Sequence, residues 1–128
     1  TRRSSDLWIR DLAPYVRAVQ EKKSMGIVAL DVRGLTSLAD AFVICSGRSN
    51  RQVTAIAEHV RRALREKGLR PLHVEGEKEG HWVLLDYGHV IIHVFYEPVR
   101  NFYDLESLWA DAPRIDLQEL IDDEERMR

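Results

Sequence analysis

One stretch of the sequence decides the fold: Trp82-Val83-Leu84-Leu85-Asp86-Tyr87-Gly88-His89-Val90-Ile91-Ile92-His93-Val94-Phe95. It contains two apolar runs, residues 82–86 and 90–95, with a glycine between them. Two such runs joined by a glycine-containing pair predict an antiparallel β-hairpin. If Tyr87-Gly88 is the two-residue turn, Asp86 is expected to lie opposite His89 and Trp82 opposite His93.

The two faces of this hairpin differ in character, because successive side chains of a strand point to opposite sides. One face is aliphatic and consists of Val83, Leu85, Val90, Ile92 and Val94. The other face is mixed and consists of Trp82, Leu84, Asp86, His89, Ile91, His93 and Phe95. The aliphatic face predicts contact with the core. The mixed face has two interpretations: a binding surface anchored by tryptophan, or a face covered by a helix of the same domain, with His93 as a core histidine.

Two strands and one helix are predicted before the hairpin. Residues 27–32 and 41–45 are apolar runs without polar alternation, which is typical of strands covered on both faces. A helix is expected over residues 50–67, where Ser49 and Gln52 have the spacing of a capping box and an apolar stripe follows. Gly68 then ends that helix as a left-handed residue.

The two ends of the chain are predicted to be less regular. The spacing of Leu12, Val16 and Val19 predicts a helix at about residues 12–23. Asp11 can cap the start of this helix, which places Pro14 in the first turn, where its missing N–H costs little. We expect a break or kink in the chain before this helix. We further expect an extended segment over residues 72–75 and a short helix or turns over 101–109, followed by a charged tail that forms at most a frayed helix. The order α-β-β-α-β-β-β predicts a single compact α/β domain, with a mixed, mostly five-stranded sheet flanked by helices.

The bulk composition restricts the functional classes. The chain has 128 residues, a net charge of -2 and a pI of about 6.2, which fits one domain without a general attraction to nucleic acid or anionic lipid. Its single cysteine, Cys45, cannot form an internal disulfide. No apolar run reaches the roughly 18–20 residues that span a bilayer. We therefore expect a cytoplasmic protein.

The residues that could carry chemistry do not form a convincing catalytic or metal site. His89 and His93 share a strand face but are about 13 Å apart by strand rise, too far for one metal ion. Cys45 ends a buried strand, where a thiol is usually inert. Residues 47–50 lead from a strand into a helix and could hold an anion, but only one glycine and no phosphate-loop lysine are present, so a capped helix start is the favoured interpretation. We predict no catalytic residue, no metal and no cofactor, and a role in binding a macromolecular partner.

Several blocks of the sequence, in order over about residues 12–113, resemble the iojap or ribosomal silencing factor family. The blocks are Ala29-Leu30-Asp31-Val32; Asp40-Ala41-Phe42-Val43-Ile44-Cys45-Ser46-Gly47; Ser49-Asn50-Arg51-Gln52-Val53; Glu75-Gly76; Trp82 to Gly88 with Val90 and His93-Val94-Phe95; and Arg100-Asn101-Phe102-Tyr103-Asp104-Leu105-Glu106 with Leu108-Trp109 and Asp111-Ala112-Pro113.

The resemblance implies both a fold and a role. The fold is expected to be similar to that of nucleotidyltransferases, without transfer chemistry, with an N-terminal extension over residues 1–11, the family domain over 12–113 and a charged C-terminal tail over 114–128. The role is to bind the large ribosomal subunit at its fourteenth ribosomal protein. Association with the small subunit is thereby blocked and translation is repressed, especially when nutrients are scarce.

The resemblance also implies which residues contact the partner: Trp82, Asp86, Tyr87 and His93. Three of them lie on the mixed face of the hairpin and Tyr87 lies at its turn, so the resemblance favours an exposed mixed face. His89 is a departure, because the family often has an acidic residue after the hairpin glycine.

Three other hypotheses stand beside this one. A nucleotidyltransferase-like enzyme would need carboxylates that converge on Mg²⁺, for which Asp31 and Asp40 are candidates, but the paired Asp-x-Asp after a Gly-Ser turn is missing. An RNA-binding module would use the basic residues of the 50–67 helix, although Glu58 and Glu66 reduce the positive charge of that helix. Contact with ribosomal RNA beside the protein site is compatible with the leading hypothesis. A homodimer would form through the mixed face itself.

Overall fold

A five-stranded mixed sheet forms the middle of the structure. The computed structural model describes the backbone of residues 2–126 and the side chains of residues 8–122. Its elements, in chain order, are α1 (Arg2–Gln20), β1 (Met25–Asp31), β2 (Ala41–Gly47), α2 (Asn50–Glu66), β3 (His73–Glu75), β4 (Trp82–Asp86), β5 (Val90–Tyr96), α3 (Glu97–Tyr103), α4 (Leu105–Leu108) and α5 (Leu117–Arg126). The strand order is β1-β2-β5-β4-β3; β2 and β5 are parallel, and the other neighbouring pairs named here are antiparallel. The predicted fold class is confirmed.

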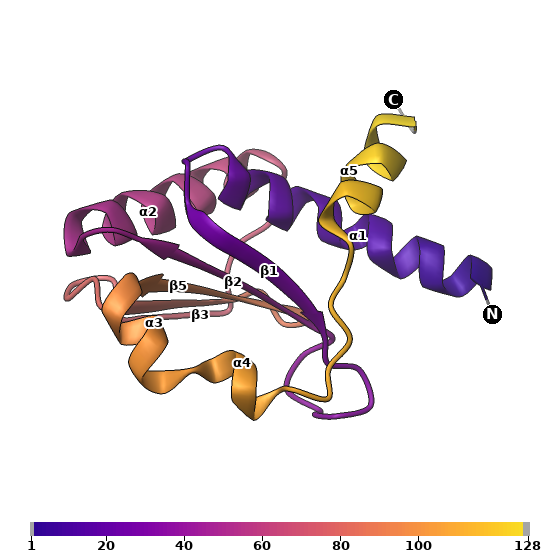
Figure 1. The fold of residues 1–128 in the computed structure, drawn as a ribbon. Coiled ribbons are helices and arrows are strands. Elements are labelled where there is room, and N and C mark those ends of the chain that lie inside the picture. The colour runs from indigo at the N-terminus through magenta and orange to yellow at the C-terminus, as the bar shows by residue number, and fades with distance from the viewer. Residues whose placement is uncertain (1, 127–128) are drawn as a thin grey trace.

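Helices cover both faces of the sheet, and α5 lies across α1 (Figure 1). Helices α1 and α2 lie on one face, and the two short helices α3 and α4 lie below the other. Strand β2 is buried along its whole length, with Val43 and Cys45 in the core under α1 and α2, and Phe42 and Ile44 in a second core on the opposite side. Strand β2 is thus a central strand covered on both faces, as predicted. The same expectation for residues 27–32 is wrong, because β1 is an outer strand of the sheet and only its Ala29 and Leu30 are buried.

Helix α2 follows the predicted capping pattern closely. The Ser49 hydroxyl accepts a hydrogen bond from the backbone N–H of Gln52 at 3.0 Å. The Gln52 amide oxygen reaches back to the backbone N–H of Arg48, one residue before the position that a capping box usually uses. Gly68 has φ +80°, which confirms the left-handed end of the helix.

The first helix is longer than predicted. Instead of beginning near residue 12, α1 runs from Arg2 to Gln20 with Pro14 in its interior. An interior proline costs about 3 kcal/mol, and two features offset that cost. Leu12 and Val16 of α1 are fully buried, and so is Leu120 of α5, the helix that crosses it. Burial of each of these side chains contributes about 1.5–3 kcal/mol. Arg10, whose carbonyl loses its helical partner, lies on the exposed side of the helix.

The C-terminal segment is also more ordered than a frayed tail. Leu120 is fully buried in the main core, and Ile115, Leu117 and Ile121 pack against that core. The packed region thus extends beyond residue 113, and at the other end Trp8 and Ile9 pack against it as well. None of the helices in the described part of the chain combines the length and apolar character that crossing a membrane requires.

The hairpin has the predicted faces, but its register differs by two residues. Trp82 lies opposite Phe95 and Asp86 opposite Ile91, and Tyr87 and Val90 close the turn with a 2.8 Å hydrogen bond from the Tyr87 N–H to the Val90 carbonyl. The two central turn residues are therefore Gly88 and His89. Gly88 has φ +91°, as the first central residue of a type II′ turn requires. Because the shift is even, the side chains that remain in the two strands keep their predicted faces. His89 does not, because it becomes a turn residue and its ring contacts Tyr15 of the main core at 5.5 Å.

The outer strand β1 is closed by a segment from the other end of the chain. Leu30 forms an isolated bridge with Arg114. The Asp31 N–H donates to the Pro113 carbonyl at 2.8 Å, and the Ile115 N–H donates to the Ala29 carbonyl at 2.8 Å. The opposite edge of the sheet is the three-residue strand β3.

Candidate functional site

The mixed face of the hairpin is largely covered, which corrects the expectation of an open surface. Phe95 is fully buried, and Ile91 and His93 are only 8% and 5% exposed. These residues belong to a second core that also includes Leu105 of α4, with Val99 and Trp109 packed against it. The alternative interpretation, in which helices of the same domain cover this face, is therefore correct for most of its residues.

Trp82 is the residue of this face at which the covered core meets the surface. Its indole is partly buried and stacks on Phe95, with ring centroids 4.7 Å apart and an interplanar angle of 30°. The indole Nε1–H donates a 3.1 Å hydrogen bond to Nδ1 of His93. The indole also contacts the ring of Tyr103, with ring centroids 5.2 Å apart. Trp82 thus joins the buried core to the outer helix α3.

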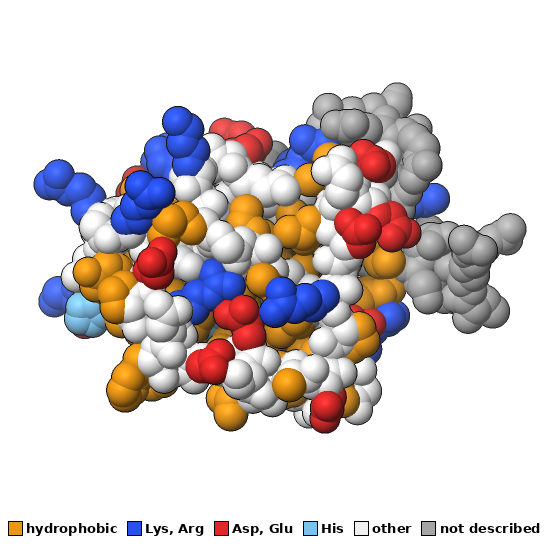
Figure 2. Space-filling view, in the orientation of Figure 1, with side chains coloured by type: hydrophobic (Ala, Val, Ile, Leu, Met, Phe, Trp, Pro, Cys, Tyr) orange, Lys and Arg blue, Asp and Glu red, His pale blue; other side chains and the backbone are white. Residues whose placement is uncertain are grey.

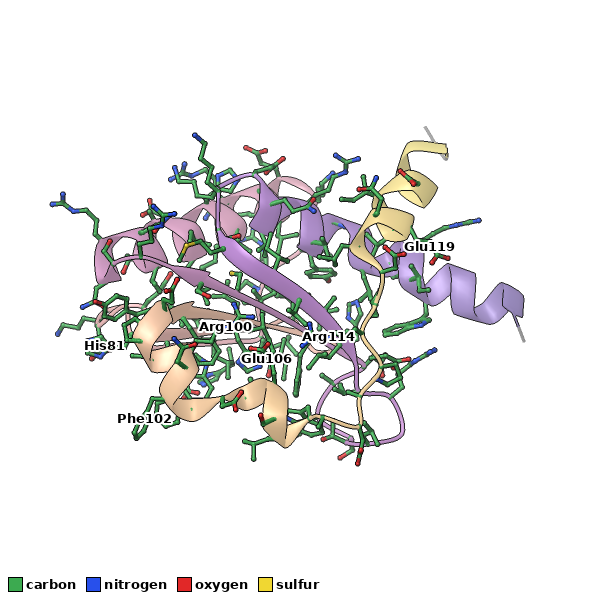
Figure 3. The ribbon with its side chains drawn as sticks, in the orientation of Figure 1. His81, Arg100, Phe102, Glu106, Arg114 and Glu119 are labelled. Atoms are coloured by element: carbon green, nitrogen blue, oxygen red, sulfur yellow. The ribbon has the colours of Figure 1, made fainter. Side chains whose placement is uncertain are left out.

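Two exposed rings on α3 extend this contact to solvent. Phe102 is 81% exposed and Tyr103 is 53% exposed, and their ring centroids are 5.1 Å apart in a T-shaped arrangement. Phe102 points away from the body of the domain below α3 (Figure 3). We call Trp82, Phe102 and Tyr103 the aromatic patch. Leu108, on the next helix, is 76% exposed. Aromatic side chains that project from a rigid support are typical anchors of protein interfaces.

The backbone between α3 and α4 shapes the patch. Pro98 lies in the first turn of α3, where its missing N–H is tolerated. Asp104 then adopts a left-handed conformation, with φ 46°, and ends α3 through a hydrogen bond from its own N–H to the Arg100 carbonyl. Its carboxylate accepts a hydrogen bond from the hydroxyl of Ser107, within α4. An aspartate is among the few residues besides glycine that adopt this conformation, and the sharp turn leaves Phe102 and Tyr103 exposed.

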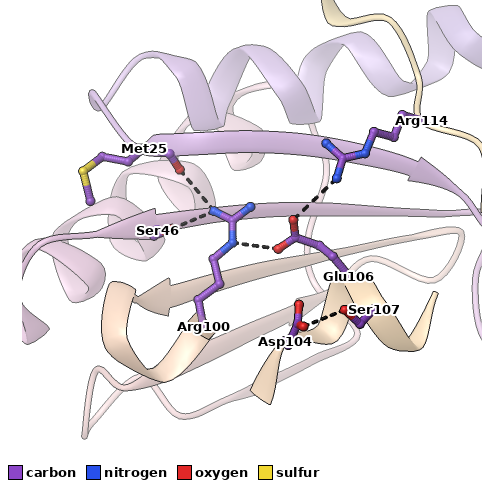
Figure 4. Close-up of polar contacts among 7 residues, drawn as sticks. All are labelled: Met25, Ser46, Arg100, Asp104, Glu106, Ser107 and Arg114. Carbon is purple, nitrogen blue, oxygen red and sulfur yellow. Dashed lines mark hydrogen bonds and ion pairs between the residues drawn. The ribbon is translucent and has the colours of Figure 1, made fainter. Parts of the chain in front are cut away.

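A buried arginine fastens α3 and α4 to the sheet (Figure 4). Arg100 Nε donates to Glu106 Oε1 at 2.8 Å, and Nη1 donates to the Ser46 hydroxyl at 2.7 Å and to the Met25 carbonyl at 3.5 Å. The Arg100 side chain is only 12% exposed. Gly26 makes room for it, because a Cβ there would lie 2.8 Å from Nη1. The helices that carry the patch are therefore tied to β1 and β2.

The surroundings of the patch are acidic. Residues 97–112 contain four carboxylates, Glu97, Asp104, Glu106 and Asp111, and one basic side chain, Arg100. That arginine is engaged inward with Glu106, whereas the other three carboxylates lie on exposed residues. Figure 2 shows hydrophobic and acidic side chains mixed along the lower edge of the molecule, while basic side chains lie across the middle of this face and at the upper left. The rim of the patch therefore favours a partner with positive charge.

The four residues that the family resemblance implies as partner contacts do not share one surface. Trp82 belongs to the aromatic patch. Asp86, at the far end of β4, accepts a 2.8 Å hydrogen bond from the Gly88 N–H and thereby supports the turn. Tyr87 is 8% exposed and packs against Tyr15 in the main core, with ring centroids 5.3 Å apart. Burial raises the pKa of Tyr87 to about 12, and its hydroxyl has no partner among the described atoms. His93 lies behind Trp82, in the second core.

The candidate chemical groups are occupied or buried. Burial raises the pKa of the Cys45 thiol to about 12, so the thiol is not a nucleophile at neutral pH. Burial also acts to raise the pKa of Asp31, but hydrogen bonds from Arg33 outweigh it and hold that pKa below its ordinary value. Across the described residues, no group of three or more His, Cys, Asp or Glu side chains is arranged to hold a metal ion.

Sequence reasoning missed Phe102 and Tyr103 as surface residues, although both lie in the Arg100–Glu106 block of the resemblance. The signal that would have found them is an aromatic pair followed directly by Asp104. Such a pair, on a helix of seven residues, has no apolar stripe through which it could be buried.

Comparisons with known proteins agree with the resemblance. The family model described as "Ribosomal silencing factor during starvation" matches residues 8–128. The chain is 42% identical over 106 residues to the ribosomal silencing factor RsfS of Halalkalibacterium halodurans, covering 83% of this chain and 91% of the relative. It is 44% identical over 100 residues to that of Bacillus subtilis, covering 78% and 85%. A crystal structure of a Chromobacterium violaceum protein matches with a TM-score of 0.74 and 40% identity, over 81% of this chain and 85% of that one. From these matches and the shared fold, the chain belongs to the ribosomal silencing factor family.

Proposed function

We propose that this protein represses translation, especially when nutrients are scarce, by binding the large ribosomal subunit at its fourteenth ribosomal protein. The bound domain blocks association with the small subunit. The protein acts in the cytoplasm as a binding protein, without catalysis and without a cofactor. The names of its relatives support the ribosomal role, and the observation that carries the proposal is the aromatic patch of Trp82, Phe102 and Tyr103.

The patch has the features of a protein interface. Phe102 is 81% exposed, yet its neighbour Tyr103 rests on Trp82, which is stacked on the fully buried Phe95. Rings supported in this way lose little conformational freedom on binding, so most of their burial contributes to affinity. A standard interface of about 800 Å² per partner would take up about a tenth of the 7614 Å² surface.

The acidic rim supports a basic protein as the first contact. Exposed carboxylates such as Glu97, Asp104 and Asp111 repel the phosphates of RNA and attract lysine and arginine side chains. If neighbouring ribosomal RNA is contacted at all, the contact belongs to the basic residues on other surfaces, such as Lys22, Lys23 and Arg48, which are exposed. We therefore propose the ribosomal protein as the anchor and the RNA as a secondary contact.

The size of the domain is sufficient for steric blocking. A 128-residue domain has a radius of gyration of about 14 Å. When such a body is bound on the face that meets the small subunit, it holds the two subunits apart by far more than the few ångströms of a contact distance. No conformational change of the ribosome is required.

Binding is tested by cosedimentation of the purified chain with purified large subunits. Phe102→Ala removes an exposed anchor without opening the core, and it is expected to weaken binding about 30-fold or more, the effect of about 2 kcal/mol. Trp82→Ala should weaken it as well. Leu72→Ala is the matched control, because Leu72 is 77% exposed but contacts the turn at the opposite end of the hairpin. Equal binding by Phe102→Ala and Leu72→Ala would refute the patch as the contact.

The block of subunit joining is tested separately by sucrose-gradient analysis of mixed subunits. Addition of the wild-type chain is expected to reduce the fraction of joined ribosomes, and addition of Phe102→Ala is expected to leave it nearly unchanged. Binding of the wild-type chain without any loss of joined ribosomes would reject steric blocking and keep only the ribosomal contact.

Self-association through the same patch is a further part of the proposal, because exposed aromatic side chains also pair between copies of one chain. Sedimentation velocity over a range of concentrations should then show a dimer that Phe102→Ala weakens. A monomer at every concentration would reject the dimer without affecting the ribosomal role.

A further inference from the structure

His93 lies directly behind the aromatic patch and does not reach the surface. The residue is 5% exposed, and its ring lies between Phe42, at 5.1 Å in a T-shaped contact, and Phe95, at 6.2 Å in a stacked one. It lies opposite Leu84 on the hairpin. A partner that covers Phe102 and Tyr103 would therefore meet Trp82 but not the imidazole itself.

The hydrogen bond between Trp82 and His93 fixes the state of the imidazole. An indole N–H can only donate, so Nδ1 of His93 must accept and the proton of the neutral ring must be on Nε2. Burial lowers the pKa of His93 to about 4, so the ring is neutral at physiological pH and its Nδ1 lone pair is available. Nε2 is buried and has no hydrogen-bond partner among the described atoms. Nδ1 therefore carries the polar contact of this side chain.

That contact determines how the indole lies. The indole of Trp82 also contacts the rings of Phe95 and Tyr103. Contacts between ring surfaces constrain the direction of the indole N–H less strictly than a hydrogen bond does. The orientation that directs Nε1 toward Nδ1 gives this part-buried donor an acceptor inside the protein, and a donor left without an acceptor is unfavourable. One acceptor thus selects one orientation.

We propose that His93 is a positioning residue of the partner-binding surface: it holds the Trp82 indole in the orientation that supports Tyr103 and Phe102, without touching the partner. The proposal rests on the proposed function and assigns His93 a role different from the direct contact implied by the family resemblance. Preorganisation of one side chain of this kind is worth about fivefold in affinity.

The first experiment needs no ribosome and no variant of His93. In the ¹⁵N-labelled protein, long-range imidazole spectra report which nitrogen carries the proton, and the Nε2–H form is expected for His93. An Nδ1–H form would overturn the proposal, because that nitrogen could not then accept from the indole.

The second experiment follows the indole N–H of Trp82, assigned by its disappearance in Trp82→Phe. Replacement of His93 by leucine, which has similar volume but no acceptor, should shift this signal and speed its exchange with solvent. His93→Asn, whose amide oxygen lies close to the position of Nδ1, should retain most of the protection. An unchanged signal in a folded His93→Leu variant would overturn the proposal. If His93→Leu does not fold, the imidazole spectrum and His93→Asn still decide.

The third experiment is a double-mutant cycle on binding to large subunits. His93→Leu should weaken binding about fivefold when Trp82 is present, and should have no further effect in the Trp82→Phe background, where there is no indole N–H to position. Equal losses in both backgrounds would overturn the proposal, because His93 would then act independently of Trp82. If the wild-type chain does not bind large subunits at all, the proposed function fails, and the exchange experiment still decides whether His93 positions the indole.

Discussion

Gly76 offers the sharpest test of how the loop before β4 supports Trp82. The residue follows β3 and has φ +80°, and a Cβ built on it would overlap the carbonyl oxygen of Trp82. Gly68 is a matched control, because it also has φ +80° but no atom lies within 4 Å of its Cβ position. The two alanine variants share the same backbone strain and differ only in the steric contact.

The expected magnitudes follow from these two contributions. Gly68→Ala should lower the free energy of unfolding by about 1 kcal/mol, the strain of a left-handed alanine. Gly76→Ala should lower it by about 3 kcal/mol, because the carbonyl of Trp82 belongs to the backbone and can move only with β4, at an overpacking cost of about 1–3 kcal/mol. With a urea slope of about 1.5–2 kcal/mol/M, the two midpoints should differ by about 1 M.

Urea unfolding monitored by circular dichroism measures both values. Equal midpoints for the two variants would refute the reasoning, since the close approach to Trp82 would then have no energetic consequence. Because the Gly76 variant displaces the strand end that carries Trp82, its affinity for large subunits should also fall, whereas that of the Gly68 variant should not.

Other substitutions probe the outer parts of the fold. Leu120→Ala should lower the free energy of unfolding by about 3 kcal/mol, because this side chain is fully buried. Leu108→Ala, at a 76% exposed position, should change it by less than about 0.5 kcal/mol in the same denaturation assay. Arg100→Met should cost about 2 kcal/mol, because the partly buried carboxylate of Glu106 then keeps only its 3.9 Å contact with the exposed Arg114. Arg62→Met at an exposed ion pair should cost less than about 0.5 kcal/mol, and similar losses for both variants would contradict the fastening role. Lowering the pH from 7 to 4 should remove about 3 kcal/mol from the free energy of unfolding through His93. Its pKa in the folded protein is about 4, below the ordinary value of 6.5. Between these two pH values the imidazole is protonated mainly in the unfolded chain, so acid favours unfolding. A His93→Leu variant should show a correspondingly flatter pH profile of unfolding, and an identical profile would reject this assignment.

The elements predicted well from the sequence are those determined by residues close together along the chain. Helix α2 was located by a cap, a stripe and a terminating glycine that all lie within twenty residues. The two hairpin faces were also correct, since they depend only on whether residue numbers are odd or even. The register was wrong by two because either Tyr87-Gly88 or Gly88-His89 can form a turn with a positive-φ glycine, and both choices give the same faces.

What the sequence did not reveal is how the second face of the sheet is covered. Helices α3 and α4 contain seven and four residues, too few for a helical period to be recognised. Their position depends on long-range contacts, above all that of Arg100 with Ser46, 54 residues away along the chain. The resemblance implies contacts for Trp82, His93 and Tyr87 alike, whereas the structure leaves Trp82 partly exposed and buries the other two. That difference depends on which helices lie over each residue.

The pairing of β1 with a segment near the C-terminus has a consequence during synthesis of the protein. Strand β1 ends at Asp31, yet the hydrogen bonds along its outer edge come from residues 113–115. During translation, more than eighty further residues must be synthesised after β1 before residues 113–115 can pair with its outer edge. Until then the edge is unpaired, and an unpaired strand edge is a template for another chain. A ribosome that stalls within that interval would leave a nascent chain with an open edge. A protein that we propose acts on ribosomes is thus itself exposed to the consequences of interrupted synthesis.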